Sequence, residues 1–163
     1  ADVERLCQRE GLSTKRRSDL PIDSEPRVDA VILDTIGELA QLYQIATAVF
    51  VGGSLVSAGG HNILEPAVHG RPIIFGPYMD NFAEIADAFL SKGAAIQVRT
   101  DRELEDAVVS LMADPVRRLR LGAAARALVD ENRGSKDKTL NVLAELLPPQ
   151  GPRAVVRPFR LVH

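Results

Sequence analysis

Residues 49–66 read Val49-Phe50-Val51-Gly52-Gly53-Ser54-Leu55-Val56-Ser57-Ala58-Gly59-Gly60-His61-Asn62-Ile63-Leu64-Glu65-Pro66. The apolar residues 48–52 predict a short buried strand, and Asn62 starts an apolar helix that is expected to run to His69. Two glycine pairs lie between them. Glycine has no Cβ and lets the backbone approach a ligand closely, while a helix N-terminus offers unpaired N–H groups to an anion. The stretch therefore predicts a phosphate site between a strand and a helix.

Strands and helices alternate along the rest of the chain. Short apolar segments predict strands over residues 12–18, 30–34, 48–52, 71–75 and 94–98. Periodic segments predict helices over residues 2–11, 35–45, 62–69, 81–92, 101–112, 115–131 and 135–147. This alternation predicts the α/β fold class, with a Rossmann-like parallel sheet covered by helices on both faces. Ligands of such sheets bind beyond the carboxyl ends of the strands, so residues 34–38 and the glycine stretch are expected on one rim.

Length and composition suggest one domain. The chain has 163 residues with a net charge of -2, so no excess of positive charge indicates a nucleic-acid partner. Residues 1–150 are expected to form one Rossmann-like domain, and residues 151–163 a basic C-terminal tail. The chain opens on a helix with no strand before it, so the first strand of the sheet is expected to be missing. No apolar run approaches the roughly 20 residues of a membrane span, which predicts a soluble chain.

Several motifs together resemble one known family. The chain contains neither Gly-x-Gly-x-x-Gly nor a P-loop. The motifs Gly52-Gly-Ser-Leu-Val, Gly59-Gly-His-Asn, Leu64-Glu-Pro, Phe75-Gly-Pro, Asn81-Phe and Glu84-Ile resemble the C-terminal half of the 3-deoxy-D-manno-octulosonic acid (Kdo) transferases. The resemblance implies the C-terminal domain of a GT-B glycosyltransferase that moves Kdo from CMP-Kdo to a lipid A precursor. Ile63 stands where this family usually has proline, and Tyr78 where it usually has histidine.

The resemblance also implies a set of residues that bind CMP-Kdo. They are Ile36, Gly37, Glu38, Ser54, Gly59, Gly60, His61, Asn62, Ile63, Leu64, Glu65 and Asn81. Glu65 is expected at the ribose, because a carboxylate accepts hydrogen bonds from hydroxyls and repels phosphate. His61 is expected to be a neutral hydrogen-bond donor, since a helix N-terminus disfavours its charged form.

Helix capping is an alternative role for the glutamates. The capping-box pattern fits Thr35-x-x-Glu38, Asn62-x-x-Glu65, Asn81-x-x-Glu84 and Thr100-x-x-Glu103. In such a box the two side chains satisfy backbone N–H groups of the first helical turn. For Glu38 and Glu65 the resemblance favours binding over capping.

The resemblance places other parts of the enzyme outside this chain. It implies that the catalytic base lies in a missing N-terminal domain, which would also bind the lipid A precursor, so no catalytic residue and no activity are expected in the fragment. No carboxylate cluster has metal-binding spacing, so no metal or other cofactor is expected. The full-length enzyme is expected at the cytoplasmic face of the bacterial inner membrane, associated with its surface. Two alternatives remain: a UDP-sugar-dependent GT-B glycosyltransferase or epimerase domain, and a non-catalytic nucleotide-binding module.

Overall fold

The computed structural model describes residues 2–21, 25–132 and 142–144. Two short 3-10 turns, η1 (Arg17–Asp19) and η2 (Asp80–Phe82), accompany the main elements. The main elements are α1 (Asp2–Arg9), β1 (Thr14–Arg16), β2 (Ala30–Ile32), α2 (Leu39–Ile45), β3 (Val49–Phe50), α3 (Leu64–Val68), β4 (Ile73–Phe75), α4 (Ala83–Ser91), β5 (Ile96–Gln97), α5 (Asp101–Ala113) and α6 (Pro115–Asn132). Residues 142–144 are helical, whereas the rest of the helix predicted over 135–147 and the basic tail lie outside the described residues.

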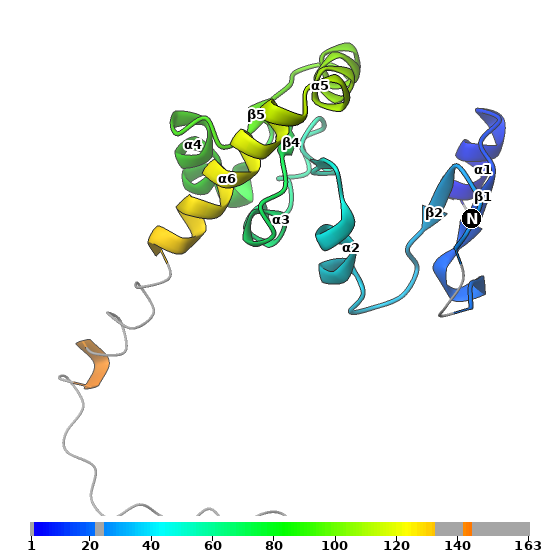
Figure 1. Ribbon diagram of the computed structural model, residues 1–163, viewed down its shortest axis with the longest axis horizontal. Helices are drawn as coiled ribbons and strands as arrows, with labels where there is room; N and C mark the ends of the chain where they lie inside the picture. Colours follow the sequence, from blue (N-terminus) through cyan, green and yellow to red (C-terminus); the bar gives the residue numbers. More distant parts are fainter. Residues whose placement is uncertain (1, 22–24, 133–141, 145–163) are drawn as a thin grey trace, which may run out of the picture.

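All strand pairs are parallel, which confirms the predicted α/β fold class, but the strands form two sheets rather than one. β1 pairs with β2, and a separate sheet has the order β3-β4-β5. Figure 1 shows α1, β1 and β2 (blue) standing apart from the larger α/β body, with α2 (cyan) between them. The prediction of one continuous sheet is therefore wrong for the described residues, because β2 hydrogen-bonds to β1 and not to β3.

The three-stranded sheet carries helices on both faces. Adjacent residues of a strand point to opposite faces, and the residues of β4 follow this rule. Ile73 and Phe75 join a cluster with residues of α3, α4 and the second half of α6. Ile74 joins a second cluster that includes Leu111 of α5 and Leu121 of α6. All three residues of β4 are fully buried, so this strand is the centre of the core.

A close approach of backbone fixes α6 against the end of α3. Gly122, in the middle of α6, faces the carbonyl oxygen of Gly70, and a Cβ at position 122 would overlap that oxygen. Arg126, one turn further along α6, donates a hydrogen bond to the carbonyl of Val68. The C-terminal end of α3 is thus held by two residues of α6, which positions α3 and the loop before it.

Helix starts differ from the predicted capping boxes. Thr100 accepts the N–H of Glu103 at 3.1 Å, so the predicted cap of α5 is confirmed. The cap residues of α2, α3 and α4 are instead Glu38, Ile63 and Phe82, none with a side-chain cap bond. The capping boxes at Thr35 and Asn81 do not form, whereas the Asn62 side chain accepts the N–H of Leu64, the first residue of α3, instead of that of Glu65. Residues 35–38, 62–63 and 81–82 precede their helices.

Candidate functional site

The glycine loop lies at the carboxyl end of β3, where the sequence predicted it. Gly53, Gly59 and Gly60 have φ values of 69°, 82° and 69°, a region that only glycine adopts easily. The N–H of Gly60 donates to the carbonyl of Gly53 at 3.1 Å, which folds the loop back on itself. Positive φ values and this bond explain why glycine is needed here.

The structure gives the second glycine pair a role in packing, besides the predicted close approach of a ligand. Gly59 and Gly60 are buried, and a Cβ on Gly59 would collide with the side chain of Asn81, while one on Gly60 would collide with Met79. The N–H of Asn81 also donates to the carbonyl of Gly59 at 3.2 Å. The pair therefore brings the loop after β3 against the loop after β4, so Asn81 lies beside the glycine loop.

Ser54 holds the same two loops together from inside. Its side chain is fully buried, and its hydroxyl donates to the carbonyl of Val51 at 2.5 Å and accepts the N–H of Gly76 at 2.7 Å. Its carbonyl accepts the N–H of Tyr78 at 2.9 Å. The Ser54 hydroxyl is fully engaged by protein groups, so we assign Ser54 to the support of the site.

The start of α3 presents a polar edge. The side-chain oxygen of Asn62 accepts the N–H of Leu64 at 3.0 Å, and its amide nitrogen donates to Glu65 Oε1 at 3.4 Å. Glu65 is exposed, as is His61, whose Nε2 lies over Gly53. Ile63 is fully buried in the core, so its side chain is unavailable to a ligand, and Leu64 packs against the same core.

Tyr43 of α2 is a neighbour of this edge that sequence reasoning did not select. Burial, together with the negative charge of Glu65, raises the pKa of the Tyr43 hydroxyl. The Tyr43 ring also lies 6.5 Å, centroid to centroid, from that of His69 at the end of α3. Helical periodicity placed Tyr43 on α2, but only the packing of α2 on α3 brings it to Glu65.

The second predicted contact region lies before α2. Ile36 is fully exposed, and Gly37 has a φ of 91°. The Glu38 carboxylate is paired with Arg17 at 3.1 Å and accepts a hydrogen bond from Thr35. The interactions of Glu38 thus join it to the segment after β1, whereas Asn62 and Glu65 interact with each other.

Two further properties describe what surrounds the site. Asn81 lines a hollow of about 370 Å³ together with its neighbours in residues 80–85. Within the described ranges, no group of three or more His, Cys, Asp or Glu side chains is arranged to hold a metal ion.

The fold and this rim define a class, namely an α/β domain with a glycine loop and a carboxylate-bearing helix at the carboxyl ends of parallel strands. No protein-family model matches the chain. The chain is 35% identical over 140 residues to the Kdo transferase of Bordetella pertussis and 36% identical over 146 residues to that of Haemophilus influenzae. These alignments cover 86% and 89% of the chain but 33% and 34% of the two relatives.

A solved structure agrees with the sequence comparison. The C-terminal CMP-Kdo binding domain of WaaA from Acinetobacter baumannii superposes with a TM-score of 0.70 and 34% identity. The match covers 78% of this chain and 66% of that one. The chain is therefore homologous to the C-terminal part of the Kdo transferases, which are glycosyltransferases, and it spans about a third of the length of the curated relatives it matches.

Proposed function

We propose that this chain is the CMP-Kdo-binding part of a Kdo transferase. The observation that carries the proposal is the superposition on a CMP-Kdo binding domain, with the glycine loop and Glu65 at the carboxyl end of β3. In the full-length protein, a hydroxyl of a lipid A precursor would displace CMP from the anomeric carbon of Kdo. The acceptor and the catalytic base would be held by the part of the relatives' length that this chain does not cover.

Some backbone N–H groups of the glycine loop are better placed than others to donate hydrogen bonds to the phosphate. The N–H of Gly60 is already bonded to Gly53, and that of Leu64 to Asn62. Among the described residues, the N–H groups of Gly59, His61, Asn62 and Ile63 have no hydrogen-bond partner, and of these four residues only His61 and Asn62 are not buried. Both lie just before α3 and outside its hydrogen-bonded turns, so we propose that they donate to the phosphate of CMP. They would stabilise the charge that develops on this leaving group.

The exposed Glu65 carboxylate would accept hydrogen bonds from the ribose hydroxyls. Asn62 donates to Glu65 Oε1, which leaves Oε2 and the remaining lone pairs of the carboxylate for the sugar. We propose that His61 donates from the same edge, that Asn81 contacts the Kdo group, and that Ile36, Gly37 and Glu38 contribute from the neighbouring stretch. CMP-Kdo would bind without a metal ion, so EDTA should not weaken its binding.

We also propose a location for the full-length protein, the cytoplasmic face of the bacterial inner membrane, where its lipid acceptor lies. In residues 2–21, 25–132 and 142–144 there is no helix with the length and apolarity needed to cross a membrane.

Nuclear magnetic resonance titration of the 15N-labelled chain with CMP tests the proposal. Amide shifts should concentrate at His61, Asn62 and Glu65, with smaller changes at residues 36–38. The affinity should be high micromolar to millimolar, about 4–6 kcal/mol, because one wall of a two-domain cleft leaves ligand surface in water. Cytidine and UMP are the matched ligands. Unmoved amides at saturating CMP would refute the site, and a preference for UMP would favour a UDP-sugar enzyme.

A further inference from the structure

The amino-terminal end of the three-stranded sheet carries a surface that the proposed donor site does not use. A hollow of about 330 Å³ opens where the segments before β3 and β4 meet the start of α6. Thr47 and Pro72, which precede the two strands, belong to its lining. Because the strands are parallel, this hollow lies at the opposite end of the sheet from the glycine loop.

Large apolar side chains stand exposed around this hollow. Ile45 and Leu119 line it and are 78% and 75% exposed, and Val116, next to the lining residue Pro115, is 75% exposed. Val116 and Leu119 are three residues apart on α6 and so share one side of the helix. Single exposed apolar residues are ordinary, whereas three around one hollow indicate a surface that is covered in use.

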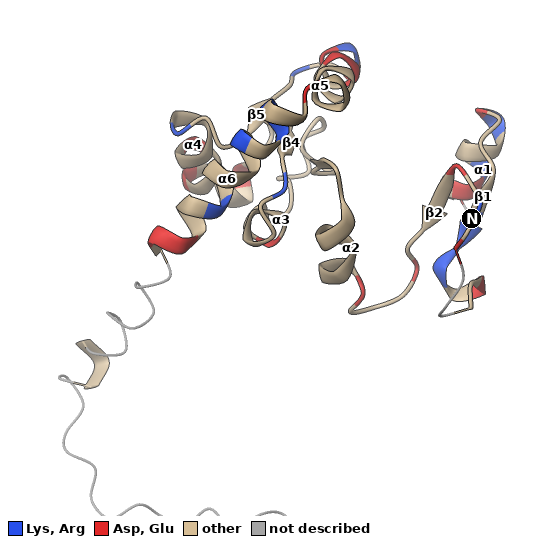
Figure 2. Ribbon diagram, viewed as in Figure 1, with Lys and Arg blue, Asp and Glu red and all other residues tan. Residues whose placement is uncertain are grey.

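The same surface is basic. Arg71 and Arg118 line the hollow, and Arg117 and Arg120 lie on the same two turns of α6. The lining contains no acidic residue, and the carboxylate of the nearby Asp114 accepts the N–H of Arg117 at 2.8 Å. Figure 2 shows basic residues along α6 and acidic ones at its C-terminal end. The chain as a whole has a net charge of -2, so this positive surface is a local feature.

Arg71 has a buried donor with no acceptor. Its Nε is buried and has no hydrogen-bond partner among the described residues, while its Nη2 donates to the carbonyl of Gln44. A buried donor without an acceptor is unfavourable, and charged donors are satisfied most strongly by anions such as phosphate. Arg71 also lines the hollow, so its guanidinium places a positive charge beside the apolar side chains.

We propose that this basic-apolar surface, formed by Ile45, Arg71, Val116, Arg118, Leu119 and Arg120, docks on an anionic lipid bilayer. Lipid phosphates would be attracted to the positive charges of Arg71, Arg118 and Arg120, while the apolar side chains would enter the interface beside them. A small free anion would bind the positive charge but would leave the apolar side chains in water. A bilayer offers anionic headgroups to the arginines and an apolar interior to the exposed apolar side chains. It can be bound while the opposite end of the sheet holds a nucleotide.

Vesicle co-sedimentation of the 163-residue chain tests this proposal independently of nucleotide binding. Vesicles of phosphatidylglycerol and phosphatidylethanolamine should bind the chain, and vesicles of phosphatidylcholine should not. Val116→Ser/Leu119→Ser should weaken binding by roughly tenfold, and Arg120→Gln by roughly fivefold. The matched control Val56→Ser/Val109→Ser removes two valines that are 64% and 61% exposed elsewhere, and should bind as the parent does.

Three results would overturn the proposal. The first is no binding to the anionic vesicles. The second is binding that persists in Val116→Ser/Leu119→Ser and Arg120→Gln, which would assign it to another segment, such as the basic tail with Arg153 and Arg157. The third is complete displacement of the chain from the vesicles by millimolar inorganic phosphate at constant ionic strength, which would mark a site for a small soluble anion.

Discussion

Ser54 links the two loops of the candidate site through a single buried hydroxyl. Replacing it with alanine leaves the Gly76 N–H without an acceptor in a buried place. Ser54→Ala should therefore lower the free energy of unfolding by about 1–3 kcal/mol, measured by chemical denaturation. Ser57→Ala, in the same loop but exposed, is the control and should change stability little. Equal stabilities of the two variants would show that the Ser54 hydroxyl does not support the loops.

Glu65 can be separated from a capping role because its carboxylate accepts from the side-chain amide of Asn62, whereas the first N–H of α3 is bonded to Asn62 itself. Glu65→Ala should weaken CMP binding by about 1.5–3 kcal/mol with little change in melting temperature. The control is Glu84→Ala, since Glu84 is also exposed in the first turn of a helix, α4, which has no side-chain cap bond. Calorimetry of CMP binding and thermal melting measure the two effects. A Glu65→Ala variant that melts earlier yet binds CMP normally would contradict the ribose assignment.

At the residue scale, the sequence located the glycine loop but did not predict which side chains pack against it. Glycine at positions 59 and 60 was expected to admit a ligand, but the structure shows that their missing side chains admit Asn81 and Met79. Such a contact joins two loops about twenty residues apart, and motif spacing carries no information on which side a Cβ would face. The ligand contacts themselves stay a prediction.

At the element scale, α6 packs closely because of one glycine. Alanine favours a helix by about 1 kcal/mol over glycine, but a Cβ at position 122 would overlap the Gly70 carbonyl. Overpacking costs about 1–3 kcal/mol, so Gly122→Ala should lower the stability on balance, measured by urea unfolding. Ala123 is the next residue and is exposed, so Ala123→Gly should lower the stability only by the difference in helix propensity between alanine and glycine. A stabilised Gly122→Ala would mean that α6 stands further from α3 than described.

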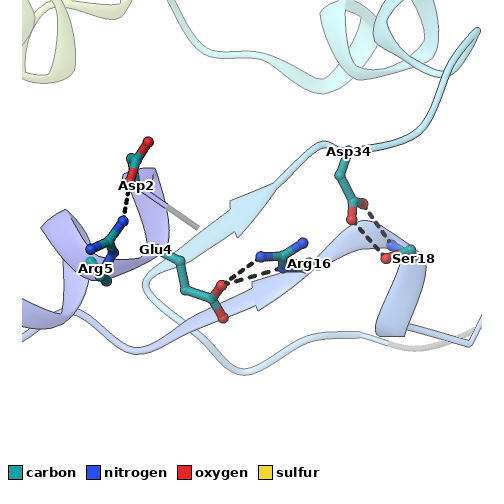
Figure 3. Close-up of polar contacts among 6 residues, drawn as sticks. All are labelled: Asp2, Glu4, Arg5, Arg16, Ser18 and Asp34. Atoms are coloured by element: carbon teal, nitrogen blue, oxygen red, sulfur yellow. Dashed lines mark hydrogen bonds and ion pairs between the residues drawn. The ribbon is translucent and has the colours of Figure 1, made fainter.

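The unit of α1, β1 and β2 is held by carboxylates rather than by a core. Figure 3 shows Glu4 paired with Arg16, and Asp34 accepting from Ser18. The hydrogen bond and charge of Arg16 lower the pKa of Glu4, and hydrogen bonds from Ser18 lower the pKa of Asp34. In the same way, the Ser13 hydroxyl and N–H lower the pKa of Asp29.

These lowered pKa values predict that acid loosens the unit. A carboxyl whose pKa is lower in the folded state stabilises that state above its unfolded pKa of about 4, and this stability is lost as pH falls through the folded pKa. The amide signals of Ser13 and Ser18 should therefore move toward unfolded positions below about pH 4, before those of β4. Asp34→Asn should show the change at Ser18 already at neutral pH. If the amide signals of β4 moved at the same pH as those of Ser13 and Ser18, the unit of α1, β1 and β2 would not unfold separately from the larger sheet.

The sequence predicted the types of the helices and strands correctly, but it did not predict where they end or how most of the helices are capped. Helices and parallel strands appear in the predicted order, because apolar periodicity reports burial along each segment. The cap at Thr100 is confirmed by its bond from the N–H of Glu103, and the Glu103 carboxylate accepts the N–H of Arg99, one residue before the cap, at 2.7 Å. At Asn81 the same pattern fails, since tertiary contact with Gly59 takes its side chain away from the helix.

At the scale of the molecule, the predicted single sheet is divided. Alternation of strands and helices predicts parallel pairing, but it does not say which strands are neighbours. The pairing of β2 with β1 leaves the outer edge of β3 without a strand among the described residues. The rim that was expected to gather residues 34–38 with the glycine loop is therefore divided as well, with Glu38 held by Arg17.

The division into two sheets predicts unequal hydrogen exchange. β1 and β2 contain no fully buried residue, and an isolated two-stranded sheet is marginally stable in water. β4 is buried throughout, so opening the larger sheet requires unfolding of the core. The Ala30 amide, bonded to Ser13, should exchange at least about 100-fold faster than the Val51 and Val98 amides, bonded to β4, once sequence effects are removed. Exchange measured by nuclear magnetic resonance gives this ratio, with the exposed, unbonded amide of Val56 as the fast reference. Equal protection of Ala30 and Val51 would mean that β1 and β2 open only together with the core, and the two sheets would then form one cooperative unit.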